Sequence, residues 1–292
     1  MIVASVEAEH CIRDCIASIL TTARSRKVEV IVADASLDDS AGVVRLSFPD
    51  AKLITMKPGT LTPNLWSEGL AHSNGRAVAF TTAHHVVPQA WIAELCSGLE
   101  SGAAAAGGPI ALEQRSTLLD AAIYFLRYSA FMPEATTESH ESTEIPGDNS
   151  IYRREVIARH ESALRDGFWE VELHQLLRVE GEHIRMIPRA TITFGRSVPL
   201  GLISRQRFAH GKHFGRWRAS QPSHSRVRII ALAPLVPFVL LARVARRVNR
   251  ANGRLGLFIR CSPIFLWLAA CWAFGEAVGA TDSVQSDYAN RR

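Results

Sequence analysis

The sequence predicts an α/β domain with a mixed, mainly parallel sheet flanked by helices, followed by C-terminal membrane helices. Short apolar runs of strand type alternate with helical patterns and tight turns through the first part of the chain, which is typical of parallel sheets covered by helices. The stretch from His183 to Gly275 contains no Asp or Glu but sixteen Arg or Lys. The two longest apolar runs, Ile229–Ala242 and Cys261–Ala280, lie in or beside this acid-free stretch.

Charge divides the 292-residue chain into two parts. The first 182 residues carry 25 acids and 15 bases, whereas the remaining 110 carry 3 acids and 18 bases. Bases without acids beside long apolar runs favour contact with anionic lipid. A nucleic-acid binder is the competing interpretation of a basic segment, and the acidic first part argues against it. We therefore expect anionic membrane lipids, and no nucleic acid, among the partners.

The start of the chain and its cysteines indicate a cytoplasmic setting. MIVASVEAEH turns acidic before any long apolar stretch, so no secretory signal is predicted. Ile2–Ala4 has the pattern of the end of a strand, and we expect a few residues of that strand to be missing. The five cysteines form no CxxC pair and show no metal-ligand spacing, which favours a reducing compartment.

The predicted strands of the first part are short apolar runs, and the predicted helices have apolar residues on one face. The strands are Ile2–Ala4, Val28–Ala33, Ala51–Met56, Ala77–Thr81, Ala103–Ile110 and Ile184–Ile187. The helices are Cys11–Thr21, Asn64–His72, Trp91–Leu99, Glu155–Ala158 and Phe168–Glu180, the last ended by Gly181. The polar stretch Glu134–Glu144 is predicted to be a mobile loop, a candidate lid.

Polar residues follow two of these strands at their carboxyl ends, where parallel sheets bind ligands. Asp34 and Ser36 come directly after one strand, and the stretch Thr82–His85 comes after another. The carboxylate of Asp34 can accept hydrogen bonds from a base N–H or from ribose hydroxyls. Ordinary turn formation is the alternative, because Asp and Ser also favour turns.

Four segments, in order over about residues 1–200, resemble the motifs of family 2 glycosyltransferases, which have the GT-A fold. VIVADASLDDS (residues 30–40) is similar to VVDDGSTDGT, and HSNGRAVAFTTAHHVVPQAW (72–91) to AxGEYIAFLDSDDWLPPDW. GDNSIYRREVI (147–157) is similar to GGNxAFRREVL, and DGFWEVELHQLLRVEGEHIRMIP (166–188) to GFDEDFFFEDVDLCLRLRRAGYRIVYVP. Each segment is loosely similar, and the four in order are a specific signal.

The resemblance implies roles for particular residues. Asp34, with Ser36, would contact the nucleotide, and Asp148 and Asn149 would line the donor and acceptor pocket. Glu170 would take the position of the catalytic carboxylate, because inverting transfer needs a base to remove a proton from the acceptor hydroxyl. For Glu170 a solvated helix carboxylate is the alternative, and for Asn149 a turn residue.

The resemblance fails at the metal-binding motif, where Thr82-Ala83-His84 replaces the family's Asp-X-Asp. A hard divalent cation that bridges a diphosphate prefers carboxylate oxygens, which Thr82 and Ala83 lack. His84 is a candidate ligand for Mn2+, since imidazole suits transition metals better than Mg2+, and His85 is its neighbour. Both histidines could also be ordinary loop residues, so the sequence leaves open Mn2+ dependence, Mg2+ dependence and metal-independent action.

The basic segment after the predicted domain resembles the corresponding part of membrane-bound family members. With Phe208, Phe214 and Trp217 among its bases, it is predicted to be an amphipathic helix at the membrane interface. A solvated basic linker is the alternative. Contact with the donor diphosphate is a further role for its bases.

The two apolar runs differ in length. Cys261–Ala280 has twenty residues and is long enough to span, whereas Ile229–Ala242 has fourteen and includes Pro234 and Pro237. If both cross, the six Arg between them lie outside, against the positive-inside tendency. We therefore expect the first run to be kinked, re-entrant or interfacial. A two-helix hairpin and a pair of soluble core helices are the alternatives. Glu276 is expected at the interface or against an Arg.

Together these features predict an inverting glycosyltransferase on the cytoplasmic face of a bacterial inner membrane. It would move a sugar from a nucleotide-diphosphate donor to a lipid-linked or glycan acceptor. The predicted organisation is a GT-A domain over 1–200, a basic interfacial segment over 201–228, membrane-associated helices over 229–280 and a polar tail over 281–292. The alternative is a catalytically impaired, glycosyltransferase-like binding or scaffold protein at the membrane, favoured by Thr82-Ala83-His84.

Overall fold

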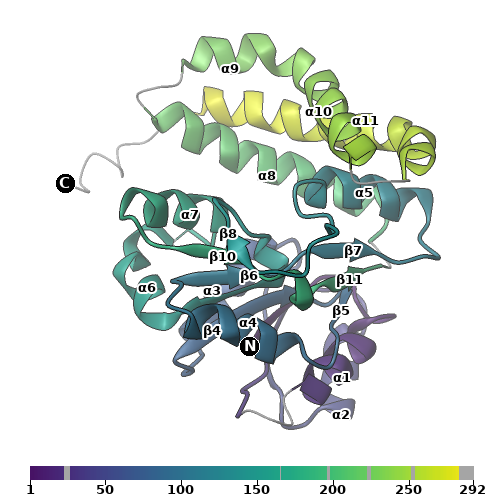
Figure 1. Ribbon diagram of the computed structural model, residues 1–292. Helices are drawn as coiled ribbons and strands as arrows, with labels where there is room; N and C mark the ends of the chain where they lie inside the picture. Colours follow the sequence, from purple (N-terminus) through teal and green to yellow (C-terminus); the bar gives the residue numbers. More distant parts are fainter. Residues whose placement is uncertain (23–26, 165, 196–197, 222–224, 251–253, 283–292) are drawn as a thin grey trace. The chain divides into compact units, whose positions relative to one another are not determined.

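The computed structural model describes residues 1–22, 27–164, 166–195, 198–221, 225–250 and 254–282. The chain forms two compact units (Figure 1). The first comprises residues 1–115 and 131–196, and the second comprises residues 116–130 and 197–292. Residues 281 and 282 are the described part of the predicted polar tail, and the rest of it lies outside the described residues.

The first unit is built on an eight-stranded sheet in the order β3-β2-β1-β4-β9-β6-β10-β8. These strands are β1 Ile2–Ser5, β2 Ile31–Asp34, β3 Lys52–Thr55, β4 Ala77–Thr82, β6 Ala105–Gly107, β8 His140–Glu141, β9 Ser150–Arg153 and β10 Ile184–Met186. β1 to β4 are mutually parallel, and β9 is inserted antiparallel between β4 and β6. The mixed, mainly parallel sheet predicted from the sequence is thus confirmed.

Helices flank this sheet (Figure 1). They are α1 Ile12–Thr22, α2 Ser40–Ser47, α3 Thr62–Ala71, α4 Trp91–Glu100, α6 Arg154–Arg159 and α7 Glu170–Val179, with short 3-10 turns η2 Gly147–Asn149, η3 Glu161–Leu164 and η4 Pro188–Ala190. The apolar faces of α1 and α4 are buried, as their 3.6-residue periodicity predicts. The sequence interpretation missed α2, whose polar start reads as a continuation of the Asp-rich turn.

An aromatic cluster forms the core beside the central strands. Phe80 of β4 stacks on Phe168 with ring centroids 4.2 Å apart, and Tyr152 of β9 meets Phe168 edge-on at 5.2 Å. Trp66 of α3 adds its ring and donates its indole N–H to the Thr81 carbonyl at 2.9 Å. The indole is therefore both buried and satisfied. Phe168 lies two residues before α7, so this cluster anchors the segment that leads into α7.

The predicted strand Ala103–Ile110 is divided in the structure. β6 belongs to the large sheet, whereas β7 (Ile110–Leu112) joins a second sheet in the order β5-β11-β7, with β5 at His85–Val86 and β11 at Ile192–Phe194. Gly108 and Pro109 separate the two strands, and the Gly108 N–H donates to the Asn149 carbonyl. Pro109 has no N–H for a ladder bond, so the apolar run cannot continue as one strand.

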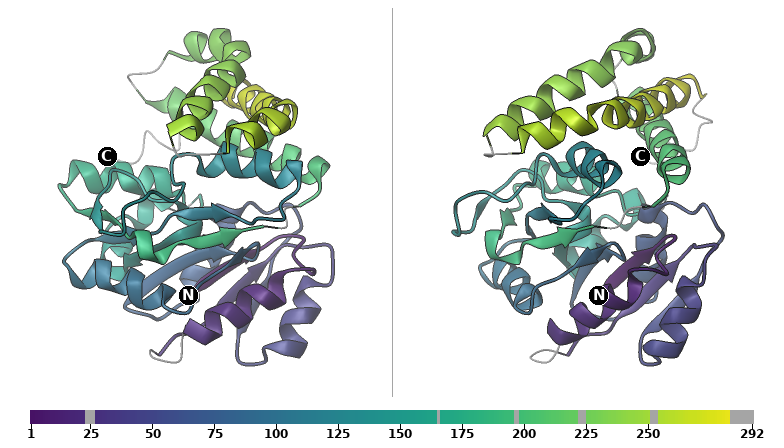
Figure 2. Two further views of the ribbon diagram at one scale, coloured as in Figure 1. Left: turned by 45° about the vertical axis from the view of Figure 1, so that its right-hand side comes forward. Right: turned by 90° about the vertical axis from the view of Figure 1, so that its right-hand side faces the viewer.

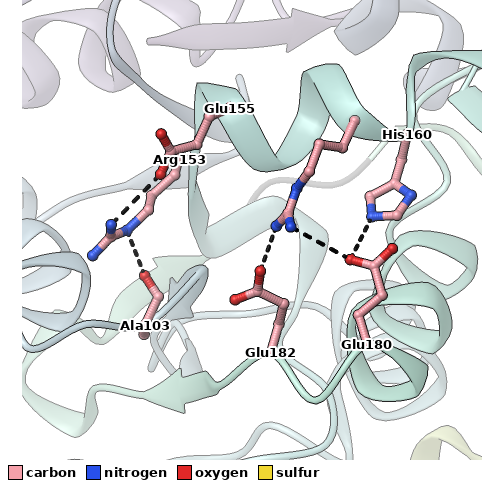
Figure 3. A network of polar contacts seen from close by, with 7 residues as sticks. Ala103, Arg153, Glu155, His160, Glu180 and Glu182 are labelled. Carbon is pink, nitrogen blue, oxygen red and sulfur yellow. Dashed lines mark hydrogen bonds and ion pairs between the residues drawn. The ribbon is translucent and has the colours of Figure 1, made fainter.

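Charged side chains join α6 to the end of α7 (Figure 3). Arg159 pairs with Glu182, and its Nη1 lies 3.7 Å from Glu180 Oε2. The same Glu180 oxygen lies 3.3 Å from His160 Nε2.

The segment Glu134–Glu144, predicted to be a loop, is exposed and contributes only the two-residue edge strand β8.

The second unit is helical. Its elements are α5 Leu118–Tyr128, α8 Leu200–Ser220, α9 Arg226–Leu232, η5 Ala233–Leu235, α10 Val236–Arg250 and α11 Leu255–Thr281. α5 begins with a capping box, because the Thr117 hydroxyl accepts from the Asp120 N–H while the Asp120 carboxylate accepts from the Thr117 N–H. α5, α8 and α10 each pack on α11, and two further views show α10 alongside α11 (Figure 2).

Four glycines allow α8 and α11 to cross at close range. They are Gly211 and Gly215 on α8, and Gly275 and Gly279 on α11. A Cβ atom on any of them would come within 2.0–2.1 Å of a backbone carbonyl oxygen of the other helix. Paired small residues four apart are the pattern of close helix pairs in membranes. Next to Gly275, Glu276 is 1 % exposed and accepts a hydrogen bond from Arg218, so its predicted position against an Arg is confirmed.

The aromatic face predicted for membrane contact lies partly against α11. Phe208 packs on Phe274 with ring centroids 5.6 Å apart, and Phe214 packs on Trp272 at 5.8 Å. The basic segment is thus a packed helix, and its interpretation as a solvated linker is wrong. The sequence alone did not show what Phe208 and Phe214 contact.

Two helical stretches, Arg226–Arg250 and Leu255–Thr281, are long and apolar enough to cross a membrane. The first is longer than the sequence interpretation allowed, because the flanking arginines also lie in helix. It is interrupted by the 3-10 turn η5, which includes Pro234, and Pro237 follows in α10. Phe238, Trp267 and Phe274 remain 56–65 % exposed along these helices.

Candidate active site

Asp34 ends β2 and is held by its own turn. Its carboxylate is 3 % exposed and accepts hydrogen bonds from the Ser36 hydroxyl at 2.7 Å and the Ser36 N–H at 3.3 Å. Such Asx-type bonds fix the direction of the side chain while leaving acceptor capacity on both oxygens. Ser36 therefore orients Asp34.

The loop between β1 and α1 is fastened to the loop after β2. The backbone N–H groups of Glu7, Ala8 and Glu9 donate to side chains after β2. Their acceptors are Ser36 (2.9 Å) and Asp38 (3.0 Å) for Glu7 and Glu9, and Ser40 at the start of α2 (3.0 Å) for Ala8. In return the Glu7 carboxylate accepts from the Leu37 N–H at 2.7 Å. Glu7 has a φ of 49°, an uncommon conformation that this two-way bonding holds in place.

Thr82-Ala83-His84 lies at the carboxyl end of β4. The Thr82 hydroxyl pairs with His85 Nδ1 at 2.9 Å, and Ala83 has no ligand atom. His84 Nε2 lies 3.1 Å from the Val6 carbonyl oxygen, so Nε2 carries the proton and donates it. These three residues offer a divalent cation one imidazole nitrogen and no carboxylate, so they do not fit a hard cation of the Mn2+ or Mg2+ type held as in the family's Asp-X-Asp.

His84 belongs to a cluster with two residues of the β1–α1 loop. Its Nδ1 lies 3.5 Å from Cys11 Sγ, and the ligand atoms of His10, Cys11 and His84 all lie within 4.8 Å of one another. The sequence interpretation found His84 but not its two neighbours. His10 and Cys11 are more than 70 residues away in sequence. No local sequence signal joins them to His84, since the parallel pairing of β1 with β4, with Ala4 opposite Thr82, brings the two loops together.

Asn149 is a buried anchor of the turn η2. Its side-chain oxygen accepts the Trp91 indole N–H at 2.7 Å, and its amide nitrogen donates to the carbonyls of Pro109 (3.0 Å) and Ala190 (2.8 Å). Both amide N–H groups are thus used within the protein. Asn149 therefore holds the turn that carries Asp148, which is 3 % exposed.

Glu170 begins α7 and packs against this turn. A Cβ atom placed on Gly147 would lie 2.8 Å from the Glu170 carboxyl carbon, so the carboxyl rests on the open face of the glycine. Glu170 is half-buried, as is Glu172 two residues on. The start of a helix favours a carboxylate through the exposed N–H groups and the helix dipole.

A buried pair of polar aromatic side chains lies near Glu170. The Tyr152 hydroxyl and His174 Nε2 are 2.8 Å apart. Burial raises the pKa of Tyr152, and the nearby Glu170 charge raises it further. Burial, followed by the charge of Arg178, lowers the pKa of His174 to about 3. His174, which shares a helix face with Glu170, is thus a neutral hydrogen-bonding partner of Tyr152 near pH 7.

The structure brings the predicted site residues to one edge of the sheet. Asp34 and Thr82 flank the end of β1, because Ser5 lies opposite Asp34 and Ala4 opposite Thr82. β9 pairs antiparallel with β4, so η2 before it lies beside the end of β4. Glu170 lies at the same edge, because its carboxyl group packs against Gly147 of η2.

Comparisons with known proteins concern the sequence family and the fold. The sequence model described as glycosyl transferase family 2 matches residues 1–160. No curated protein sequence gives a significant match.

Solved structures resemble this chain at low sequence identity. The mannosyltransferase PcManGT from Pyrobaculum calidifontis, in complex with GDP-Man and Mn2+, is 16% identical with a TM-score of 0.52, over 92% of this chain and 85% of that one. S. aureus TarS 1-349 in complex with UDP-GlcNAc is 11% identical with a TM-score of 0.48, over 91% and 70%. The GT-A fold expected from the sequence is confirmed.

Proposed function

Because this chain belongs to glycosyltransferase family 2, we propose that it moves a sugar, with inversion, from a nucleotide-diphosphate donor to a lipid-linked or glycan acceptor. The site of action is the cytoplasmic face of a bacterial inner membrane. A neighbour of the same fold was captured with GDP-Man, which supports a sugar nucleotide as donor. The observation that carries the proposal is the position of the Glu170 carboxyl, against Gly147 at the edge of the sheet that also presents Asp34.

Asp34 is the proposed contact for the nucleotide base or ribose. Asp34 is nearly buried, so few water molecules compete for its carboxylate. A hydrogen bond from the nucleotide to this charged group therefore contributes more than a hydrogen bond to a neutral acceptor. Ser36 acts by orienting Asp34. Asp148 lines the donor and acceptor pocket, and Asn149 contributes by holding the turn on which Asp148 lies.

Glu170 is the proposed general base. The acceptor oxygen attacks the anomeric carbon, the bond from that carbon to the diphosphate oxygen breaks with its electron pair on the nucleotide, and Glu170 takes the acceptor proton. One displacement inverts the anomeric configuration. Contact with Gly147 and the start of α7 keeps the carboxylate in position for this transfer.

Attachment to the membrane is proposed for the second unit. Its two long apolar helices expose large side chains, and arginines lie beside them. Bases at the ends of apolar helices stabilise contact with anionic headgroups at about 1 kcal/mol each. The interrupted stretch Arg226–Arg250 is proposed to lie at the interface or to re-enter, since a full hairpin would place six arginines outside. The predicted division into residues 1–200, 201–228, 229–280 and 281–292 remains our proposal for the domain organisation.

The test is release of nucleoside diphosphate from UDP-, GDP- and dTDP-sugars by the full-length chain, with and without a bacterial membrane lipid extract. Melting temperatures measured with each donor report binding separately. We expect one donor class to raise the melting temperature, and the lipid extract to accelerate its turnover. A donor that binds without turnover in any extract would contradict the proposal and support a non-catalytic binding or scaffold role, which the Thr82-Ala83-His84 segment favours.

A further inference from the structure

The cluster of His10, Cys11 and His84 joins two loops that meet at the carboxyl ends of β1 and β4. Cys11 is buried, His84 is half-buried and His10 is exposed, so the cluster runs from the interior to the surface. Their ligand atoms all lie within 4.8 Å of one another.

The separation between Cys11 and His84 fits a tetrahedral zinc site. Zinc lies about 2.3 Å from sulfur and about 2.0–2.1 Å from imidazole nitrogen. At a tetrahedral angle these bond lengths place sulfur and nitrogen about 3.5 Å apart, and Cys11 Sγ and His84 Nδ1 are 3.5 Å apart. A hydrogen bond from the Cys11 sulfhydryl to His84 Nδ1 gives the same spacing. Metal binding, measured as described below, distinguishes a zinc site from this hydrogen bond.

The hydrogen bond on the far side of His84 leaves the correct nitrogen for a metal. Nε2–H donates to the Val6 carbonyl oxygen at 3.1 Å, so the lone pair is on Nδ1, the atom that faces Cys11. A metal-binding histidine commonly donates its second ring N–H to a carbonyl or carboxylate in this way, which fixes the ring and its tautomer.

The loop that carries His10 and Cys11 is held in place without a metal. The three N–H groups of Glu7, Ala8 and Glu9 donate to side chains after β2, and the Cys11 N–H donates to the Ala8 carbonyl at 2.9 Å. Little ordering is therefore left for the binding step, which favours affinity.

We propose that His10, Cys11 and His84 form a site for a divalent cation of the zinc class, with a fourth position open to an oxygen of the donor diphosphate. Thiolate and imidazole ligands favour Zn2+ or Co2+ over Mn2+ and Mg2+. One thiolate and two neutral imidazoles leave the ion with a formal charge of about +1 toward the diphosphate. The diphosphate part of this inference depends on the proposed transferase function, whereas the metal site itself does not.

The first experiment adds Co2+ to chelator-treated, full-length protein and records absorption spectra. We expect one bound Co2+ with a thiolate-to-metal charge-transfer band in the near ultraviolet, removed by competing Zn2+. Cys11→Ser should lose the band and bind Zn2+ at least about tenfold more weakly, and His84→Ala should also bind more weakly. Cys96→Ser is the matched control, since Cys96 lies on α4 of the same unit outside the cluster, and it should keep the band. Metal-free melting temperatures show whether each variant folds.

The second experiment measures donor binding by melting temperature with Zn2+ or with chelator. We expect Zn2+ to increase the shift produced by the bound sugar nucleotide in wild type and in Cys96→Ser, but not in Cys11→Ser. A wild-type protein without the charge-transfer band, or with Zn2+ affinity equal to that of Cys11→Ser, overturns the metal site. A band combined with Zn2+-independent donor binding overturns the open position for diphosphate. If no sugar nucleotide shifts the melting temperature under any condition, the transferase proposal fails, whereas the Co2+ spectra still decide the metal site.

Discussion

The close crossing of α8 and α11 makes Gly275→Ala a sharp test of the second unit. The added Cβ would lie 2.1 Å from the Phe208 carbonyl oxygen, whereas real Cβ atoms essentially never approach within 3.0 Å. The helices must therefore separate by roughly 0.9 Å, and a gap of this size loses about a quarter to a half of the dispersion energy at each contact. The obstacle is backbone, so no side chain can rotate away.

The expected loss of stability is the difference between two opposing terms. Overpacking of this kind costs about 1–3 kcal/mol or more, and alanine recovers up to about 1 kcal/mol through its higher helix propensity. Gly256→Ala is the matched control, because it lies on the same helix with nothing within 4 Å of its added Cβ. Unfolding in detergent should show Gly275→Ala less stable than wild type by about 1–2 kcal/mol and Gly256→Ala equal or more stable. Equal stability of the two variants would refute the crossing.

Three predictions concern the first unit. Phe168→Ala removes the ring stacked 4.2 Å from Phe80 and should lower the free energy of unfolding by about 3–5 kcal/mol, measured with urea; a loss below about 1 kcal/mol would contradict the described core. Asp34→Asn should weaken sugar-nucleotide binding about 10- to 100-fold by calorimetry, because a charged acceptor becomes neutral, whereas the exposed Asp50→Asn should have no effect and an equal effect would remove Asp34 from the site. The folded pKa of His174, about 3, lies below its unfolded value of about 6.5, so the unfolded state binds more protons between these values and stability is lost as pH falls from 6.5 towards 3. His174→Gln should flatten that loss by up to about 1.4 kcal/mol per pH unit, and an unchanged acid profile would show that His174 is not buried as a neutral ring.

Much of the first unit could be predicted because its strands are local signals. The run Val28–Ala33 is β-branched and apolar, and the polar residues after it are necessarily at a strand end. Asp34 and the end of β4 lie at the same edge of the sheet, with the end of β1 between them, because β2, β1 and β4 are parallel. The division of Ala103–Ile110 was missed because Gly108 and Pro109 send the chain to another sheet, a tertiary effect that apolar periodicity does not contain.

Features that depend on pairing across long sequence separations were not predictable. Cys11 reads as part of an apolar helix face, and only the pairing of β1 with β4 brings it to His84. The four-residue spacing of Gly211 with Gly215, and of Gly275 with Gly279, is a local signal for close helix packing, but the helix that each pair faces depends on the fold. Glu170 is a candidate only through the family motif, since a half-buried glutamate at a helix start is common.

The central claim is that Glu170 removes the acceptor proton, and Glu170→Gln tests it most directly. Glutamine keeps the shape but has no basic carboxylate, so the rate of transfer at saturating donor should fall by about 100-fold or more, with the donor dissociation constant unchanged. Glu172→Gln, in the same first turn of α7, should keep near wild-type turnover. Turnover of Glu170→Gln within about threefold of wild type, with donor still bound, would contradict the assignment.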